Sequence, residues 1–129
     1  MELKLRSKKR EEIIDITKEI ESYVKKSKVK QGFCLIYVPH ATAAVTINES
    51  YDKAICSDFL EALRKIAPKG IWKHDKIDNN GDSHIKAAIV GPSEIIPIKD
   101  FELTLGRWQG IMFYEFDGPR ERKVIVEIK

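Results

Sequence analysis

Apolar and polar residues alternate in the first segment of the chain, Glu2–Arg6 (ELKLR), as they do in a half-exposed β-strand. A second short strand is predicted over Glu11–Ile16 (EEIIDI). From Thr17 onward the period lengthens to that of an α-helix, and Asp15 or Thr17 can cap its start. The apolar face of this predicted helix consists of Ile16, Ile20, Tyr23 and Val24.

The next segments predict apolar strands and a second helix. Phe33–Val38 (FCLIYV) is apolar at every position, which is typical of a central strand covered on both faces. Val45–Ile47 predicts another strand, and Ser50 is placed to cap the helix that follows. Pro68 and Gly70 end that helix. Its predicted buried stripe consists of Ile55, Phe59, Leu63 and Ile66.

The segment Lys69–Ser83 is irregular, and a loop of this length in a small domain is often functional. Asp82 or Ser83 can cap a short third helix over His84–Val90. The remaining predicted strands are Glu94–Ile98, Phe101–Leu105, Gly110–Phe116 and Arg122–Ile128. We expect the last two to pair antiparallel, because a turn of sequence DGP joins them.

Together these elements predict one α+β domain over residues 1–129: a mixed, mainly antiparallel sheet packed with two main helices and one short helix. The composition agrees, since 43% hydrophobic and 33% charged residues can fill a core and still solvate the surface. No apolar run approaches the roughly 20 residues of a membrane helix. The charged N-terminal segment does not resemble a signal peptide. We therefore expect a cytoplasmic protein that does not contact membranes.

The net charge of +3 is small, and basic and acidic residues are interleaved. The basic run at residues 8–10 (KKR) is followed at once by two glutamates and predicts a solvated surface turn. Nucleic-acid binding is not expected, because it requires a one-sided basic surface, whereas a small anionic substrate suits a mild basic excess. Cys34 and Cys56 are far apart in apolar surroundings and form no C-x-x-C motif, so we expect buried, reduced thiols.

The chain has only three histidines, His40, His74 and His84, and each lies at the end of a predicted element or in a loop. Each also has a polar companion, and these companions are Glu49, Asp75 and Asp82. Three imidazoles with one open coordination position suit a catalytic divalent metal ion, zinc or magnesium, with a carboxylate nearby as base or orienting group. The alternative is three separate, hydrogen-bonded structural histidines. His40 and Glu49 lie too far apart for strand alternation to place them on one face, so a sharp turn would have to bring them together.

Two further clusters can carry chemistry. In the segment Gly106–Gly110 (GRWQG), a kink between the glycines can aim Trp108 and Gln109 at a cavity, or Trp108 can fold over the core of a hairpin loop. Glu115 lies within an apolar strand and needs a partner, because burying an unpaired charge is costly. Arg120 or Arg122 can supply an ion pair, or these arginines can bind a phosphate group.

Three blocks of the sequence, PHATAAVTINE, NNGDSHIKAAIVGPSEIIPI and LGRWQGIMFYEFDGPR, resemble the YjbQ family, also called UPF0047, in this order and spacing. The resemblance covers nearly the whole chain, with Ala41 and Ala43 departing from the usual pattern of the first block.

The resemblance implies a small α+β fold that assembles into homotrimers, and a secondary thiamine-phosphate synthase activity in some members. It implies His40, His74 and His84 as metal ligands. It further implies Glu49, Asp82 and Gln109 as catalytic or supporting residues. The arginines at 107, 120 and 122 and Trp108 would then contact a small phosphorylated substrate. A trimeric protein that binds a metal or ligand without catalysis is the alternative, since no nucleophile is recognisable. The strands Gly110–Phe116 and Glu94–Ile98 are expected to offer the apolar surface for assembly.

Overall fold

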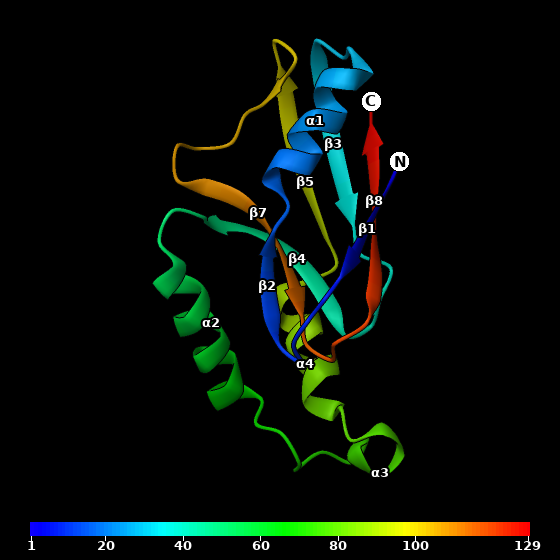
Figure 1. The fold of residues 1–129 in the computed structure, drawn as a ribbon, viewed down its shortest axis with the longest axis vertical. Coiled ribbons are helices and arrows are strands. Elements are labelled where there is room, and N and C mark those ends of the chain that lie inside the picture. Colours follow the sequence, from blue (N-terminus) through cyan, green and yellow to red (C-terminus); the bar gives the residue numbers. More distant parts are fainter.

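The strands of the protein, described for all 129 residues by a computed structural model, form two antiparallel sheets (Figure 1). In spatial order the five-stranded sheet contains β1 (Glu2–Arg6), β8 (Glu121–Ile128), β3 (Gln31–Tyr37), β5 (Ser93–Lys99) and β6 (Glu102–Leu103). The three-stranded sheet contains β2 (Glu12–Asp15), β7 (Gln109–Glu115) and β4 (Ala43–Glu49). The α+β class is confirmed, but the strands divide between two sheets where the sequence predicted one.

Four helices complete the fold, and they are α1 (Thr17–Ser27), α2 (Lys53–Ile66), α3 (Asp75–Asp78) and α4 (Gly81–Val90). The start of α1 is confirmed, because the carboxylate of Asp15 accepts a hydrogen bond of 2.9 Å from the backbone N–H of Thr17. None of the helices combines the length and the apolar character needed to cross a lipid bilayer.

The starts of the other helices differ from the prediction. The side chain that caps α2 is Asp52, which accepts the N–H of Ala54, so the prediction of Ser50 as the cap is wrong. Helix α4 begins at Gly81, three residues earlier than predicted, and this places Asp82 and Ser83 inside the helix rather than at its cap. The loop before α4 contains the single turn of α3, which the sequence does not predict because it has no apolar periodicity.

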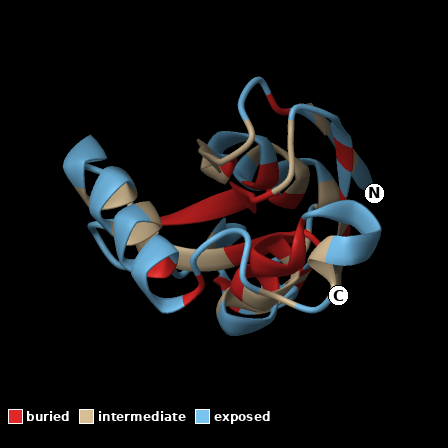
Figure 2. Cartoon of the chain, turned by 90° about the horizontal axis from the view of Figure 1, so that it is seen from below, coloured by how far each residue is buried: buried red, intermediate tan, exposed pale blue.

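Strand β7 is the centre of the hydrophobic core, because both of its faces are buried. Ile111 and Phe113 point into the larger core between the two sheets and α1. Met112, Tyr114 and Phe116 point the other way, into a smaller core under α2 and α4. Figure 2 shows this buried centre, with the long helix α2 at its side and largely exposed. Helix α2 buries only Leu63 fully, and Ile66 at the end of its predicted stripe is 62% exposed.

Two predicted strand relationships are wrong. β3 is central in its sheet, but the chain covers only one of its faces, and Phe33 and Tyr37 on the other face are 43% and 41% exposed. β7 and β8 do not pair with each other, because the chain crosses to the other sheet at the turn after Glu115. β8 instead pairs with β1 and β3.

A buried ion pair joins the two sheets at this crossing. Glu115 at the end of β7 is fully buried, and its carboxylate accepts hydrogen bonds from Nε of Arg122 in β8 at 3.0 and 3.1 Å. The hydroxyl of Ser7, just after β1, donates to the same carboxylate at 2.6 Å. Arg122 also donates through Nη2 to the hydroxyl of Thr42 at 2.7 Å, and this fixes the loop before β4. The predicted ion pair of Glu115 is therefore confirmed, with Arg122 as the partner.

Replacing Glu115 by glutamine is expected to lower the free energy of unfolding by about 3–5 kcal/mol, because the Arg122 guanidinium then stays buried without a counter-charge. The matched control is Glu121→Gln. Glu121 faces Arg6 at 3.6 Å, but the two side chains are 84% and 69% exposed, so this change should cost less than about 1 kcal/mol. Denaturant unfolding followed by circular dichroism measures both values. Equal stability of the two variants would contradict the assigned role of the pair.

Candidate functional site

His40 lies in the loop between β3 and β4, and the backbone of β8 holds its ring. Its Nε2 accepts a hydrogen bond of 3.0 Å from the backbone N–H of Lys123. Partial burial and the nearby Arg122 guanidinium lower the pKa of His40. The imidazole is therefore neutral at pH 7, with the lone pair of Nε2 already in use.

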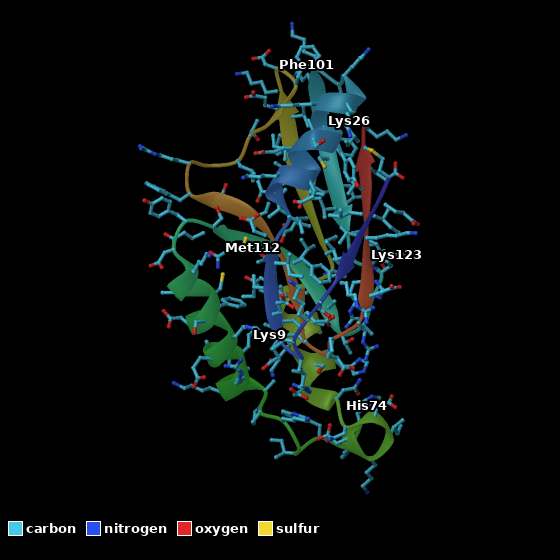
Figure 3. The ribbon with its side chains drawn as sticks, in the orientation of Figure 1. Lys9, Lys26, His74, Phe101, Met112 and Lys123 are labelled. Carbon is cyan, nitrogen blue, oxygen red and sulfur yellow. The ribbon has the colours of Figure 1, made fainter.

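His74 and His84 are in direct contact. Their rings meet edge to face, with centroids 4.6 Å apart and planes inclined at 75°. His74 directly precedes α3 at the lower end of the molecule (Figure 3), and His84 lies in the first turn of α4. Nε2 of His74 is buried and makes no hydrogen bond, since the carboxylate of Asp78 is 3.8 Å away. The structure thus brings two of the three histidines together.

Asn80 presents a second unsatisfied polar atom beside the histidines. The residue is only 8% exposed, and its Nδ2 donates to the carboxylate of Asp117 at 2.8 Å. Its Oδ1 is buried without a partner. Oδ1 of Asn80 and Nε2 of His74 are the only buried side-chain polar atoms of the chain that lack one. Such unpaired buried atoms are rare in folded proteins.

His40, His84 and Asn80, but not His74, line a polar hollow of about 620 Å³, which we call the histidine cleft. It brings His40 and His84 together with two arginines of the predicted substrate-binding set. The cleft is lined by Pro39, His40, Ala41, Thr42, Asp78, Asn80, His84, Asp117, Arg120 and Arg122. Nε of Arg120 donates to the backbone oxygen of Asp117 at 2.8 Å, and its Nη2 contacts the carboxylate of Asp117 at 3.0 Å. Both guanidinium groups are therefore held in place by neighbouring acids.

Four of the predicted residues, Glu49, Arg107, Trp108 and Gln109, lie at the opposite end of the three-stranded sheet. Glu49 pairs with Gln109 across β4 and β7, whereas Ala43 pairs with Glu115 at the cleft end. Six residues of extended strand separate the two ends by roughly 20 Å. Within one chain, Glu49 therefore does not reach His40, and the sharp turn that would have brought them together does not form.

Trp108 and Arg107 share the far end with Glu49. Trp108 is 49% exposed and packs edge to face against Tyr51, with ring centroids 5.0 Å apart. The guanidinium of Arg107 lies 5.0 Å from the centroid of the Trp108 ring, within the range of a cation–π contact. The side-chain oxygen of Gln109 accepts the N–H of Gly106 at 2.8 Å, so Gln109 stabilises its own loop. Trp108 neither covers the core nor faces the histidine cleft.

Asp82 lies behind the cleft in a buried charge network and does not line it. Its carboxylate accepts from Nζ of Lys86 at 2.9 Å and from Nη2 of Arg10 at 3.0 Å. Lys86 is 1% exposed and also donates to Glu11 at 2.8 Å, and Glu11 accepts from Arg64 of α2. Arg10 was expected in a solvated turn, but it extends to the helix because the buried Asp82 carboxylate requires a second cation.

Sequence reasoning missed Asn80, Asp78 and Asp117 as cleft residues. Asn80 and Asp117 belong to turn-forming segments, NNGDS and DGP, and turn propensity alone explains asparagine and aspartate in such segments. Both residues match the motifs of the YjbQ family that the sequence resembles, and this match is the only feature of the sequence that points to them. Asp78 carries no signal of its own, because the single turn of α3 positions it.

The predicted three-histidine metal site is not formed by the side chains of one chain. His74 and His84 are in contact, but Nε2 of His40 is occupied by the N–H of Lys123. No group of three or more histidine, cysteine, aspartate and glutamate side chains is arranged to hold a metal ion. Catalytic zinc sites use three protein ligands, so two imidazoles with the unpaired Oδ1 of Asn80 nearby do not fit such a site without a further donor.

The fold and the cleft define a small α+β protein with a polar, histidine-lined hollow at the edge where its two sheets join. Compared with known proteins, the whole chain, residues 1–129, matches the family model described as UPF0047 protein YjbQ-like. A UPF0047 protein of Archaeoglobus fulgidus is 46% identical over 98% of both chains. UPF0047 protein YugU of Bacillus subtilis is 38% identical over 98% of this chain and 96% of its own. The chain belongs to the YjbQ (UPF0047) family.

Solved structures share the same fold. An uncharacterised YjbQ/UPF0047 protein of Clostridium acetobutylicum superimposes with a TM-score of 0.96 and 43% identity, covering 100% of this chain and 99% of its own. A YbjQ-like protein of unknown function from Sulfolobus solfataricus also gives a TM-score of 0.96, at 37% identity, covering 99% of this chain and 94% of its own. The relatives establish the family and the fold, and their descriptions name no activity.

Acid is expected to destabilise the protein through three paired carboxylates. Burial favours protonation of Glu11, Asp82 and Glu115, but hydrogen bonds from lysine and arginine outweigh it and lower the pKa of each. A carboxylate with a lowered folded-state pKa stabilises the fold above its unfolded pKa, and this stability is lost as the pH falls through the folded value. The free energy of unfolding should therefore decline as the pH falls below the pKa range of carboxyl groups in the unfolded chain.

Asp82→Asn should flatten this decline over the same pH window, as measured by urea unfolding from pH 7 downward. An unchanged slope in that variant would contradict the assignment.

Proposed function

We propose that the histidine cleft binds a small phosphorylated substrate and that the protein is an enzyme acting on it. The observation that carries this proposal is convergence: His40, His84 and the guanidinium groups of Arg120 and Arg122 come from three segments, the β3–β4 loop, α4 and the start of β8, and line one hollow. Guanidinium groups hold phosphate oxygens in a planar fork, and imidazole is the side chain best suited to moving protons near pH 7.

The chemistry that suits these residues is departure of a phosphorylated leaving group. Arg120 and Arg122 are fixed by Asp117 and Glu115, so they would stabilise negative charge on the leaving oxygen without moving. His84 has no hydrogen bond from its ring to the protein and is free to give or take a proton at the reacting group. Arg122 is nearly fully buried, which strengthens its effect because little water screens it.

The particular reaction that the family resemblance suggests is thiamine-phosphate synthesis. There a pyrimidine-methyl pyrophosphate loses pyrophosphate, which leaves with the electron pair of the C–O bond, and a thiazole nitrogen attacks the freed carbon. The two arginines would hold the pyrophosphate. This reaction stays a prediction, and other transfers that release a phosphorylated group would use the same residues.

A divalent metal ion, zinc or magnesium, also stays a prediction. The two imidazoles in contact are those of His74 and His84, and the carboxylate of Asp78 lies 3.8 Å from Nε2 of His74. A metal ion at this pair needs a further ligand from the substrate or from a second subunit, and we assign no catalytic step to it. Metal dependence of the activity is therefore one arm of the test below.

The second candidate is a ligand-binding protein without catalysis. It is favoured by the absence of a free nucleophile in the cleft, because the single hydroxyl there, on Thr42, already accepts a hydrogen bond from Arg122. Tight binding of phosphorylated metabolites without turnover would support this candidate. For either function we expect the protein in the cytoplasm.

His84→Ala should lower turnover of a pyrimidine-methyl pyrophosphate and thiazole phosphate pair by about 100-fold or more, if the histidine acts as an acid or base. Arg120→Gln should weaken binding of the phosphorylated substrate about tenfold, through loss of one charge-assisted contact. The matched control is Arg107→Gln, since Arg107 lies at the opposite end of the sheet. Calorimetry and a coupled pyrophosphate-release assay, each with and without added zinc or magnesium, measure both effects. Background turnover in the wild type and all variants would overturn the enzymatic proposal.

We also propose that the chain forms a homotrimer through the outer face of the five-stranded sheet. Ile95 is 63% exposed there, beside the half-exposed Phe33 and Tyr37, so β5 offers the apolar surface expected of it. Strand β7 does not, because residues 110–116 are buried inside the chain. Exposed apolar patches of this kind mark assembly surfaces.

Sedimentation at micromolar concentration should therefore give three times the chain mass of 14.8 kDa. Ile95→Glu should shift the protein towards the monomer, because a charge would be buried at the interface. Ile66→Glu on α2, at an equally exposed position outside this face, is the control. A wild-type monomer, or a trimer unaffected by Ile95→Glu, would contradict the proposed interface.

A further inference from the structure

The two ring nitrogens of His40 have different roles. Nε2 accepts the backbone N–H of Lys123, so it carries no hydrogen. A neutral imidazole has one N–H, and the hydrogen must therefore be on Nδ1. Nδ1 makes no hydrogen bond to the protein and is not among the buried unsatisfied atoms, so it is open to the solvent side of the loop. His40 thus offers a donor, and not a lone pair, to a ligand.

Arg122 presents a donor of the same kind. It is 5% exposed, and its Nε and Nη2 are taken up by Glu115 and Thr42. Nη1 is the one nitrogen of this side chain without a protein partner, and it is not among the buried unsatisfied atoms. A nearly buried guanidinium with one free, accessible nitrogen is a fixed donor whose orientation costs little entropy when a ligand binds.

His40 and Arg122 line a second hollow as well as the cleft. This hollow, of about 520 Å³, lies over β1 and β8, and we call it the basic depression. It is lined by Lys4, Leu5, Arg6, His40, Glu121, Arg122 and Lys123. His40 and Arg122 are the two residues that the cleft and the depression share. Figure 3 shows Lys123 on β8, on the side of the molecule where β1 crosses it.

Positive charge dominates the basic depression. Its single acid, Glu121, is 3.6 Å from Arg6 in an exposed pair, and Lys123 is 3.8 Å from Glu2 in another. Pairs of this exposure and length neutralise little charge. Lys4 takes part in no ion pair. An anionic group placed beside His40 therefore meets two fixed donors and a positive field.

We infer that the border between the histidine cleft and the basic depression is an anion-binding site, in which Nδ1–H of His40 and Nη1 of Arg122 donate to one phosphate group and His40 does not ligate metal. The inference rests on the proposed function for the identity of the anion as phosphate. Metal ligation by His40 would require it either to give up the Lys123 hydrogen bond or to lose the Nδ1 proton. His74 and His84 remain the imidazoles available to a metal ion.

Nitrogen-15 NMR of the full chain labelled at histidine tests the inference directly, because the ring nitrogens report the tautomer. His40 should show the Nδ1–H tautomer at pH 7. Inorganic phosphate should shift its Nδ1 signal, and zinc should shift the signals of His74 and His84 while leaving His40 unchanged.

His40→Asn keeps an amide donor near the position of Nδ1 and should keep the phosphate Kd within about threefold. His40→Phe should raise it about tenfold or more. The amide spectra of both variants establish that they are folded.

Three results would overturn the inference: the Nε2–H tautomer, a zinc-induced shift of His40, or equal phosphate affinity of the Asn and Phe variants. If phosphate shifts His84 but not His40, the inference fails while the proposed function survives. If phosphate shifts neither histidine, the proposed function fails as well. The tautomer measured without any ligand still decides whether His40 is a donor or a lone-pair ligand.

Discussion

The structure depends on the requirement that the buried carboxylate of Glu115 be paired. A charge with no exposed surface has to be met by a counter-charge and by hydrogen bonds on its remaining lone pairs, because water does not reach it. Arg122 supplies the charge from the other sheet, and Ser7 and the backbone N–H of Asp117 supply the remaining bonds. One interaction therefore determines where β7 ends, where β8 begins and how the two sheets meet. The histidine cleft lies at this junction, so its position follows from the same constraint.

A second buried network fixes the other wall of the cleft. Lys86 lies between Asp82 and Glu11, and Arg10 and Arg64 complete the pairing from the chain before β2 and from α2. The network sets the start and the orientation of α4, whose first turn carries His84 and follows Asn80. The hydroxyl of Ser83 adds a bond of 2.6 Å to the backbone oxygen of Phe116, directly after β7. The two charge networks thus hold the two walls of the cleft: Arg122 lines it, whereas Glu115, Asp82 and Lys86 lie outside its lining.

Local patterns of the sequence were enough to predict the elements but not their partners. The helical face of Ile20 and Val24 is buried as predicted, and the need for a partner at Glu115 is visible in the sequence because a single carboxylate interrupts an apolar strand. The pairing of β8 with β1 and β3 depends on contacts more than 80 positions apart, which no local signal encodes. The exposure of one face of β3 differs from the prediction for a related reason. An apolar strand face has the same sequence whether its own chain or another subunit covers it.

The separation of His40 from Glu49 shows how strand geometry limits what a motif can do. The segment PHATAAVTINES contains both residues, but β4 is a rigid spacer that places them at opposite ends of the sheet. Inside the histidine cleft, unlike in the basic depression on the other side of His40, the charges are largely compensated, Arg122 by Glu115 and Arg120 by Asp117. Net charge therefore contributes little to recognition inside the cleft. Recognition must come from the directions of fixed donors, which depend on the surrounding hydrogen bonds. This explains why Glu115, Asp82 and Lys86, which anchor the walls of the cleft, are more deeply buried than the residues that line it.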